Sequence, residues 1–230
     1  MEYKNIHKGI FKNRPNRFIA YVEINGQEEI CHVKNTGRCR ELLIPGSIVY
    51  LEESDNPNRK TKYDLVAVQK NNLLINMDSQ APNKVVQEWL ASTNCEILLE
   101  AKERKIKPEC KYKNSRFDFY IETENRKIFM EVKGVTLEEK GVVRFPDAPS
   151  ERAVKHLEEL MEAKKEGYET YVMFVVQMEE LSYFTPNEDT HPRFCEALRK
   201  AAKKGVNVLA YDCRVTPASL KLRKQVEVRL

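Results

Sequence analysis

The stretch that most constrains the fold of this chain is residues 116–134, which combines strand-forming residues with a polar turn. Apolar and polar side chains alternate from Phe117 to Ile121, and a second apolar run begins the segment Phe129–Lys133. Glu124 and Asn125 lie between the two runs and are typical of a turn. The stretch therefore predicts a β-hairpin whose turn is centred between these two residues.

This register places two carboxylates side by side, because Asp118 falls directly opposite Glu131. Directly opposed residues of an antiparallel pair have Cβ atoms about 5 Å apart, and like charges at that position repel each other. A divalent cation between them would remove the repulsion. Strand side chains repeat every two residues, so Glu131 and Lys133 share one face while Val132 turns into the core. The sequence thus predicts a face with two carboxylates and an ammonium group.

Such a face suits phosphodiester hydrolysis. Carboxylates hold Mg²⁺, the metal ion stabilises charge on the phosphate, and a lysine polarises or positions the attacking water. The alternative is an ordinary solvated strand face in a chain whose residues are 32% charged. The spacing of Asp118, Glu131 and Lys133 resembles the core of the PD-(D/E)xK nuclease superfamily, although Phe117 stands where the motif has proline.

The composition is that of a soluble globular protein, and 230 residues suffice for one large or two small domains. Residues 1–5 lead into no apolar segment of a signal peptide, and no apolar run approaches the roughly eighteen residues of a membrane span. We therefore expect a cytoplasmic protein without membrane association. The six cysteines form no C-x-x-C pair and are expected to be reduced, mostly buried thiols. The net charge of +4 is mild, so the nature of a partner depends on where the charge lies.

Residues 1–78 show the pattern of a series of short strands. We expect strands at residues 18–24, 29–33, 48–51, 63–68 and 73–76. Asn25-Gly26 between the first two is a strong hairpin signal. Five strands with such connections predict a small closed or nearly closed barrel, of which the OB-fold is the commonest version that binds nucleic acid.

The loops of this predicted barrel are basic. Their side chains could follow a phosphate backbone while aromatic rings stack on bases. A lysine-rich solvated surface is the alternative explanation. The basic loop residues are Arg14, Arg17, Lys34, Arg38, Arg40, Arg59, Lys60 and Lys62, of which we select Arg17, Lys34, Arg38 and Arg40 as candidate DNA contacts, with Arg38 and Arg40 first.

The pattern changes at Pro82-Asn83, which divides the chain into domains of residues 1–80 and 81–230. In the second domain we expect helices at residues 83–92, with Asn83 as the N-cap, 151–165 and 191–204, and further strands at residues 96–99, 171–177 and 206–211. This order predicts an α/β sandwich of the restriction-endonuclease type. The expected fold class is α/β, or α+β with two domains: an OB-like β-barrel followed by a restriction-endonuclease-like α/β domain.

Basic residues also surround the predicted hairpin. The segment from Lys102 to Arg116 carries seven Lys or Arg against two Glu, and it directly precedes Asp118. Arg152 and Lys155 lie on the first turns of the helix that follows the hairpin. We therefore add Arg116, Arg152 and Lys155 to the candidate DNA contacts.

Further short motifs are spread in order along the whole chain. They are Asn35-Thr36-Gly37, Pro45-Gly46, Ser115–Phe119, Glu131–Leu137, Phe145–Ala148, Glu151-Arg152 and Lys155–Leu157. Together they resemble the sugar fermentation stimulation protein A (SfsA) family. The resemblance implies an N-terminal OB-like domain, a C-terminal PD-(D/E)xK nuclease-like domain, and binding of single- or double-stranded DNA.

The resemblance also implies a set of site residues. Asp118, Glu131 and Lys133 match the catalytic core of the nucleases, and Glu88 matches the helix glutamate that many of them add as a metal ligand. The implied cofactor is Mg²⁺ or Mn²⁺, held by Asp118, Glu131, Glu88 and the carbonyl of Val132.

Other chemistries have less support. The four histidines show no metal-ligand spacing, and Cys31, His32 and Cys39 lack a fourth zinc ligand. His156 is expected to be a hydrogen-bonded helix residue rather than a catalytic base. The sequence contains no P-loop, G-x-G-x-x-G motif or nucleophile elbow.

Two hypotheses from different classes remain. The first is a Mg²⁺-dependent DNA endonuclease in which Lys133 activates water beside metal held by Asp118 and Glu131. The second is a non-catalytic, DNA-binding regulator of sugar (maltose-type) metabolism that uses a nuclease-like fold as a platform. The first is favoured, because a protein that needs only affinity gains nothing from two carboxylates that face a polyanion. Monomer and homodimer both remain open.

Overall fold

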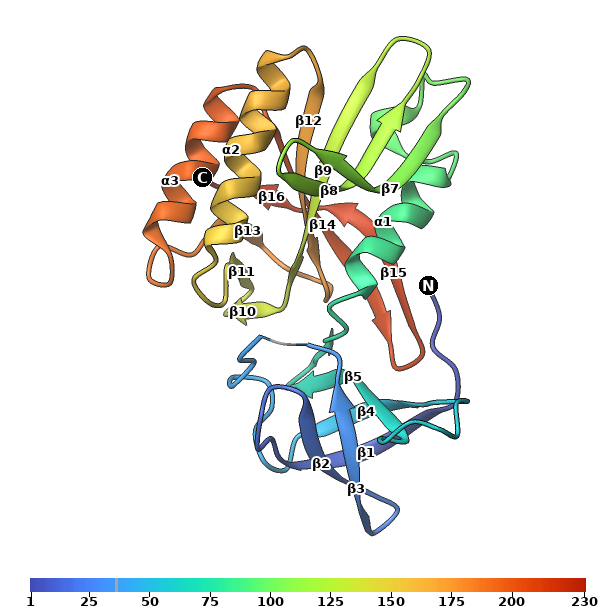
Figure 1. Ribbon diagram of the computed structural model, residues 1–230. Coiled ribbons are helices and arrows are strands. Elements are labelled where there is room, and N and C mark those ends of the chain that lie inside the picture. The colour runs from blue at the N-terminus through green and yellow to red at the C-terminus, as the bar shows by residue number, and fades with distance from the viewer. Residues whose placement is uncertain (36) are drawn as a thin grey trace.

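The N-terminal part of the protein is a closed β-barrel (Figure 1) in the computed structural model, which describes residues 1–35 and 37–230. Its strands are β1 (Ile6–Asn13), β2 (Ile19–Ile24), β3 (Gln27–Val33), β4 (Ile48–Glu53) and β5 (Tyr63–Lys70), and β6 (Leu73–Asn76) is added beside β5. β1 pairs with β2 and β4, and β3 pairs in parallel with β5, so the sheet closes on itself. Thr36, part of one motif discussed above, lies outside the described residues.

The β2–β3 hairpin forms where the sequence predicts it. Asn25 and Gly26 both have positive φ, at 52° and 80°, as a two-residue hairpin turn requires. Ala20 and Val22 alternate with partly exposed neighbours and are fully buried inside the barrel. The period-two pattern of β2 therefore reflects one face in the core and one face toward solvent.

The membership of the barrel differs from the prediction. The sequence pattern does not predict β1, and residues 73–76 form an added strand rather than a member of the closed barrel. Gly9 interrupts the apolar alternation of β1, and glycine is needed there because a Cβ would lie 2.5 Å from Cγ1 of Val22. The close packing of β1 on β2 requires this glycine, and the glycine interrupts the alternation of apolar and polar residues that would have predicted the strand.

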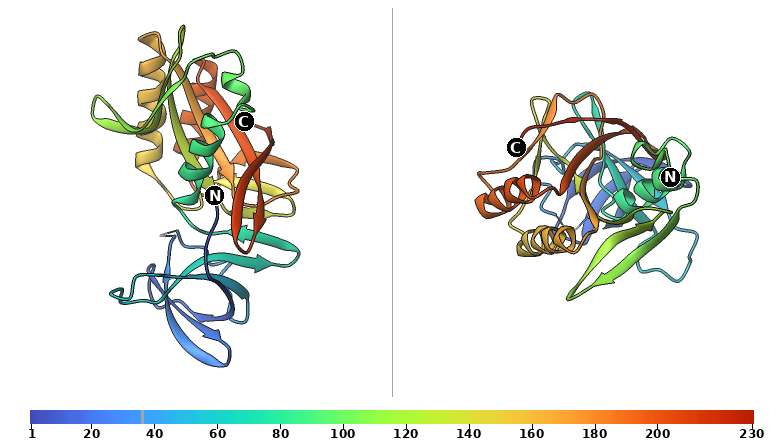
Figure 2. Two further views of the ribbon diagram at one scale, coloured as in Figure 1. Left: turned by 90° about the vertical axis from the view of Figure 1, so that its right-hand side faces the viewer. Right: turned by 90° about the horizontal axis from the view of Figure 1, so that it is seen from above.

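The C-terminal part has three layers (Figure 2). Its elements are α1 (Ala81–Ala91), the 3₁₀ turn η1 (Glu96–Leu98), β7 (Lys105–Tyr112), β8 (Ser115–Glu122), β9 (Lys127–Val135), α2 (Glu151–Lys165), β12 (Glu169–Val176), α3 (Pro192–Lys203), β14 (Asn207–Thr216) and β15 (Ser219–Gln225). The sheet order is β15-β14-β12-β9-β8-β7, with β12 parallel to both β9 and β14. α1 covers one face, and α2 and α3 cover the other. None of the helices in the described part of the chain has the length and apolar character needed to cross a membrane.

A second, small sheet extends from the end of the layered part nearest the barrel to the side of the main sheet (Figure 1). It consists of β10 (Leu137–Glu139), β11 (Val142–Phe145), β13 (Tyr183–Pro186) and β16 (Glu227–Val228). These strands are two to four residues long, too short for a period-two pattern to predict. Of these strands, β10 and β11 lie in the connection from β9 to α2 (Figure 1), whereas β13 follows β12 and β16 follows β15.

Two local predictions in this half are wrong. Residues 96–99 do not form a strand, because Cys95 and Leu98 are buried at the three-residue spacing of a 3₁₀ turn. Asn83 does not cap α1, since the helix begins at Ala81. The side chain of Asn83 has a different partner, described below.

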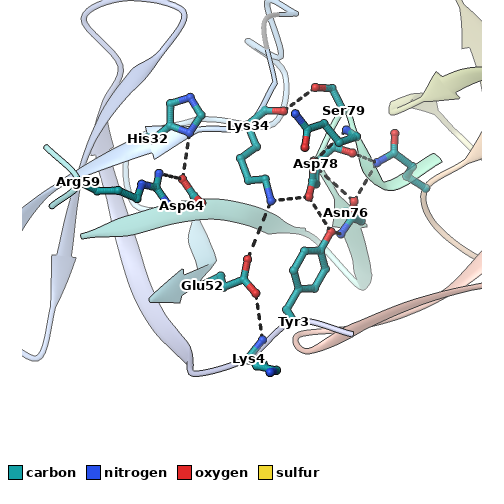
Figure 3. Close-up of polar contacts among 12 residues, drawn as sticks. Tyr3, Lys4, His32, Lys34, Glu52, Arg59, Asp64, Asn76, Asp78 and Ser79 are labelled. Carbon is teal, nitrogen blue, oxygen red and sulfur yellow. Dashed lines mark hydrogen bonds and ion pairs between the residues drawn. The ribbon is translucent and has the colours of Figure 1, made fainter. Parts of the chain in front are cut away.

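A buried polar network joins the two parts (Figure 3). The side chain of Gln177, which follows β12, donates to Oδ1 of Asn76 at 2.8 Å and to the carbonyl of Asp78 at 3.0 Å. The hydroxyl of Tyr3 donates to Asp78 Oδ2 at 3.3 Å, and the ammonium of Lys34 lies 2.8 Å from the same oxygen. Asp78 is fully buried, so its carboxylate needs these partners to offset the cost of burial. The network fixes the barrel to the end of β12.

Candidate active site

Asp118 and Glu131 meet where β8 and β9 stop pairing. The ladder of paired residues runs from Glu122↔Lys127 to Phe119↔Met130. The next position in this register sets Asp118 opposite Glu131, as the hairpin pattern predicts. Beyond the ladder, the amide of Val132 donates a hydrogen bond of 2.7 Å to Oδ2 of Asp118. The side chain of Asp118 therefore replaces a backbone acceptor at the open end of the hairpin.

A second contact holds Asp118 from the helical layer. Asn83, in the first turn of α1, donates from Nδ2 to Oδ1 of Asp118 at 2.8 Å. Burial and the nearby charge of Glu131 raise the pKa of the Asp118 carboxyl, in spite of these hydrogen bonds. Two neighbouring acidic groups that raise each other's proton affinity favour a positive ion between them.

Glu131 is 3% exposed and lies on the sheet face toward α2. Its Oε1 is 2.5 Å from Nζ of Lys133 and is also hydrogen-bonded to Nδ1 of His156. Burial alone would raise the pKa of Glu131, but the hydrogen bond with His156 and the charge of Lys133 outweigh burial and lower the pKa. The side chain is therefore held in its ionised form. Its other oxygen, Oε2, is buried and has no hydrogen-bond partner among the described residues.

The unpartnered oxygen fits a divalent cation. Buried polar atoms are nearly always satisfied, so an orphaned carboxylate oxygen requires an explanation. Mg²⁺ is commonly bound by one or two carboxylates and keeps several waters. Asp118 and Glu131 supply that donor set, to which the carbonyl of Val132 could add. No cluster of three or more His, Cys, Asp or Glu suited to a metal occurs within the described ranges.

Glu88 is placed away from these carboxylates. Its Oε2 lies 2.7 Å from the amino group of Met1, and its side chain is 58% exposed. Asn83 is the residue of α1 that reaches Asp118. We therefore leave Glu88 out of the proposed metal set.

His156 is a site residue that the sequence pattern does not reveal. It is buried on α2, and its Nε2 accepts a hydrogen bond of 3.4 Å from Nε of Arg152 one turn earlier. It is a hydrogen-bonded helix residue, as expected, but the carboxylate that it contacts is Glu131. The spacing of Arg152 and His156 is visible in the sequence, whereas the packing of their helix face on β9 is not.

A basic groove lies between the β7–β8 hairpin and α2, with a volume of about 910 Å³. Three predicted DNA contacts line it, together with His156. Its charged lining residues are Lys111, Lys113, Arg116, Arg152, Lys155 and Arg193, with Glu151 and Glu158 as the acidic members. Some of these cations form ion pairs, such as Arg116 with Glu109 at 3.1 Å, where both side chains are 63% exposed. Exposed pairs of this kind are weak, so phosphates could compete for the cations.

The predicted contacts of the barrel divide into two groups. Arg17, Arg38 and Arg40 are exposed and line one depression, which we call the barrel pocket. Lys34 is not among them, because its ammonium lies inside the network of Figure 3, against Asp78, and is 15% exposed. The prediction that Lys34 faces DNA is not supported, since its charge is neutralised within the protein.

The closed barrel, followed by the layered second half, defines a mixed α/β protein with an N-terminal OB domain. The family model described as "SfsA N-terminal OB domain" matches residues 13–77, and the model described as "Sugar fermentation stimulation protein RE domain" matches residues 80–219. The chain belongs to the sugar fermentation stimulation protein (SfsA) family.

Relatives are similar over the full length. A sugar fermentation stimulation protein homolog of Ruminiclostridium cellulolyticum is 58% identical over 230 residues and covers 100% of both chains. A homolog of Desulfitobacterium hafniense strain Y51 is 60% identical over 230 residues, 100% of this chain and 99% of its own. The solved structure of Pyrococcus furiosus SfsA in complex with Ca²⁺ has a TM-score of 0.88 at 28% identity, and the match covers 100% of this chain and 98% of that one.

Proposed function

We propose that this protein binds DNA and hydrolyses phosphodiester bonds with a divalent cation held by Asp118 and Glu131. In this proposal the second domain is nuclease-like, with a PD-(D/E)xK core formed by Asp118, Glu131 and Lys133. The cofactor is Mg²⁺ or Mn²⁺.

The observation that carries the proposal is the state of the Glu131 carboxylate. Burial should make this group neutral, yet His156 and Lys133 keep it ionised through one oxygen and leave the other free. These contacts satisfy one oxygen of Glu131 only, and a cation beside the second oxygen would offset the repulsion between the two carboxylates. The Ca²⁺ complex of the Pyrococcus furiosus relative supports a divalent cation in this fold.

Each residue has a distinct task. When bound, the metal ion would stabilise charge on the phosphate and lower the pKa of a water molecule. Lys133 places an ammonium beside Glu131, where it can donate to that water or to a phosphate oxygen in the transition state. His156 fixes the orientation of Glu131, and Asn83 and the Val132 amide fix that of Asp118.

DNA binding is supported by the arrangement of positive charge. The basic groove borders the site through His156, and the barrel pocket carries four arginines of the neighbouring domain. A depression lined by residues of both domains, among them Asn35, Gly134 and Ser150, lies between them. It shares Gly37 and Ala148 with the barrel pocket. We infer that a DNA strand follows these three depressions.

A non-catalytic DNA-binding regulator of sugar metabolism is the second candidate. The name of the relatives refers to sugar fermentation, and the basic groove would bind DNA whether or not cleavage occurs. The two candidates differ in what they require of Asp118 and Glu131.

Cleavage assays with matched variants test the proposal. Plasmid and oligonucleotide DNA would be incubated with wild type, Asp118→Asn, Glu131→Gln and Lys133→Ala in Mg²⁺, Mn²⁺ or EDTA. We expect metal-dependent cleavage by the wild type and losses of at least about 10²-fold in each variant, with DNA affinity retained. Glu88→Gln is the control, because it removes a carboxylate from the same domain but outside the site.

A contaminating nuclease would cut equally well in all preparations, so equal cleavage by the three variants rejects the catalytic proposal. Metal-independent DNA binding without cleavage in either metal would leave the regulator as the better account.

A further inference from the structure

The barrel pocket has the size and lining of a small-molecule site. Its volume is about 620 Å³, within the range of roughly 300–1,000 Å³ that is usual for ligand pockets. Its apolar lining residues are Phe11, Leu43, Pro45 and Ala148, which we call the floor, and its polar ones include Asn13, Arg14, Asn16, Arg17, Arg38 and Arg40, which we call the rim. No Asp or Glu is among the residues that line it in the described part of the chain. The pocket therefore combines an apolar floor with a cationic rim.

Arg14 builds the rim rather than supplying free charge. Its Nη1 donates to the carbonyls of Gly37 and Arg38 at 3.0 and 3.1 Å, and its Nη2 donates to those of Arg17 and Asn35, both at 2.6 Å. One guanidinium thus ties the loop before β2 to the loop after β3. Arg17 and Arg38, whose backbone carbonyls it binds, are thereby held at the same pocket.

Arg17, Arg38 and Arg40 supply the free charge. All three are exposed, and none forms an ion pair within the described ranges, whereas many other arginines of the chain do. The guanidinium of Arg17 lies over the ring of Phe18, 5.8 Å from its centroid, and Phe18 is 50% exposed. Three unpaired guanidinium groups around one opening favour a phosphate, which arginine binds through two hydrogen bonds.

The floor distinguishes among phosphate-bearing ligands. A sugar phosphate would need several hydrogen-bond partners for its hydroxyl groups, and the uncharged polar side chains of the lining are limited to Asn13 and Asn16 and the buried thiol of Cys39. A nucleobase presents flat apolar faces and polar edges. Leu43, Pro45 and Ala148 match the faces, and the two asparagines can meet the edges.

We propose that the barrel pocket binds one unstacked nucleotide, with the base on the apolar floor and its phosphate at Arg17, Arg38 and Arg40. This inference rests on the proposed function where the nucleotide belongs to a DNA strand. The pocket shares Gly37 and Ala148 with the depression that leads toward β9, so an unpaired nucleotide would be held on the strand path to Asp118 and Glu131. The substrate class is then DNA with an unpaired base near the cleavage position.

Binding of three matched DNA hairpins tests the proposal. One stem is fully paired, one has a single unpaired adenine, and one has an abasic site in place of that adenine. Affinities would be measured by fluorescence anisotropy in EDTA, which prevents metal-dependent cleavage. We expect the unpaired adenine to improve affinity about tenfold over the paired stem, and the abasic site to lose that gain.

Variants at Ala148 test the location. Ala148→Phe should fill the pocket and abolish the gain in affinity, whereas Ala148→Ser should keep it. If Ala148→Phe does not fold, Ala148→Leu takes its place and should reduce the gain. A gain that survives in Ala148→Phe, or in the abasic hairpin, overturns the proposal. Equal binding of paired and unpaired stems by wild type also overturns it, while leaving DNA binding itself intact.

Free deoxyadenosine monophosphate tests whether the pocket binds a free nucleotide or a nucleotide within a DNA strand. Binding of this compound by wild type in calorimetry, lost in Ala148→Phe, supports a pocket for free nucleotides. Binding of the unpaired stem without binding of the free compound supports a pocket for a strand. If wild type binds no DNA at all, the proposed function fails. If wild type also does not bind the free nucleotide, the proposal of a nucleotide pocket is rejected too.

Discussion

Nδ1 of His156 is hydrogen-bonded to the buried carboxylate of Glu131, a residue 25 positions earlier in the chain and in a different layer of the domain. The bond uses the same oxygen that Lys133 contacts, so both donors lie on one side of the carboxylate. Because both donors contact Oε1, the second oxygen, Oε2, stays available to a metal ion or another group bound at the site.

Replacement of His156 by alanine should destabilise the fold. Glu131 would stay buried with one partner fewer, which costs about 1–3 kcal/mol when a buried polar group is left unsatisfied. Urea unfolding would be measured for His156→Ala, for Glu131→Gln and for the double variant. The interaction energy is the difference between the change in unfolding free energy of the double variant and the sum of the two single changes. Additive effects of the two changes would show that this hydrogen bond contributes nothing.

Lys34 and Arg38 should behave in opposite ways, although both are basic loop residues of the barrel. Lys34→Ala leaves Asp78 buried without its cation, so stability should fall by roughly 3–5 kcal/mol. Arg38→Ala should leave stability within about 0.5 kcal/mol, and it should weaken DNA binding for all sequences with a salt slope lower by about 1. Urea unfolding and salt titrations of DNA affinity separate the two effects. A sequence-selective loss in Arg38→Ala would instead indicate base readout.

Glu138 should make stability depend on acid pH. Its carboxylate lies in β10 and binds Nζ of Lys70 in β5 at 2.7 Å, which links the two domains. Burial opposes ionisation, but the hydrogen bonds from Lys70 and the Gly141 amide lower the pKa of Glu138. Because the folded pKa lies below the unfolded one, the stabilisation is present above the unfolded pKa and is lost as pH falls through the folded pKa.

The measurement for this ion pair compares wild type with Glu138→Gln by urea unfolding from neutral pH to about pH 3. The difference in unfolding free energy should shrink as the pH falls. A difference that stays constant over this range would mean that the charge of Glu138 does not stabilise the fold.

Gly134 should not tolerate alanine. A Cβ at this position would lie 2.6 Å from Oε1 of Gln177 and 2.9 Å from Cγ of Pro82, so the β9 backbone beside Lys133 would have to shift. We expect a loss of about 1–3 kcal/mol in stability and a loss of cleavage activity beyond that. Gln177→Ala removes one of the clashing groups but also the hydrogen bonds of Gln177 to Asn76 and Asp78, so the double variant is compared with Gln177→Ala alone. Unchanged activity in Gly134→Ala would show that the position of Lys133 tolerates the shift.

The local pattern around Asp118 was sufficient to predict the hairpin and its register. Period-two alternation and a polar turn depend on neighbours in sequence, and the pairs from Glu122↔Lys127 to Phe119↔Met130 follow them. The same holds for α2, whose predicted bounds of residues 151–165 agree with the structure. β7 was not predicted, because it is an edge strand that carries Pro108 and several lysines.

The partners of the site residues depend on tertiary packing and could not be predicted. Asparagine is a residue type that often caps helices, but α1 begins at Ala81, so Asn83 lies within its first turn and its side chain binds Asp118. Lys34 resembles a DNA contact in sequence, but Asp78, 44 residues later, neutralises it. In both cases a short polar pattern fits two roles, and the packing of distant segments selects between them.

The central claim is that Asp118 and Glu131 hold one divalent cation, and a crystal soaked in Mn²⁺ tests it most directly. Anomalous diffraction should place a single strong peak between the Asp118 carboxylate and Oε2 of Glu131, and the peak should be absent from Glu131→Gln crystals. A map without a peak at this position, at a Mn²⁺ concentration that supports cleavage, would contradict the account.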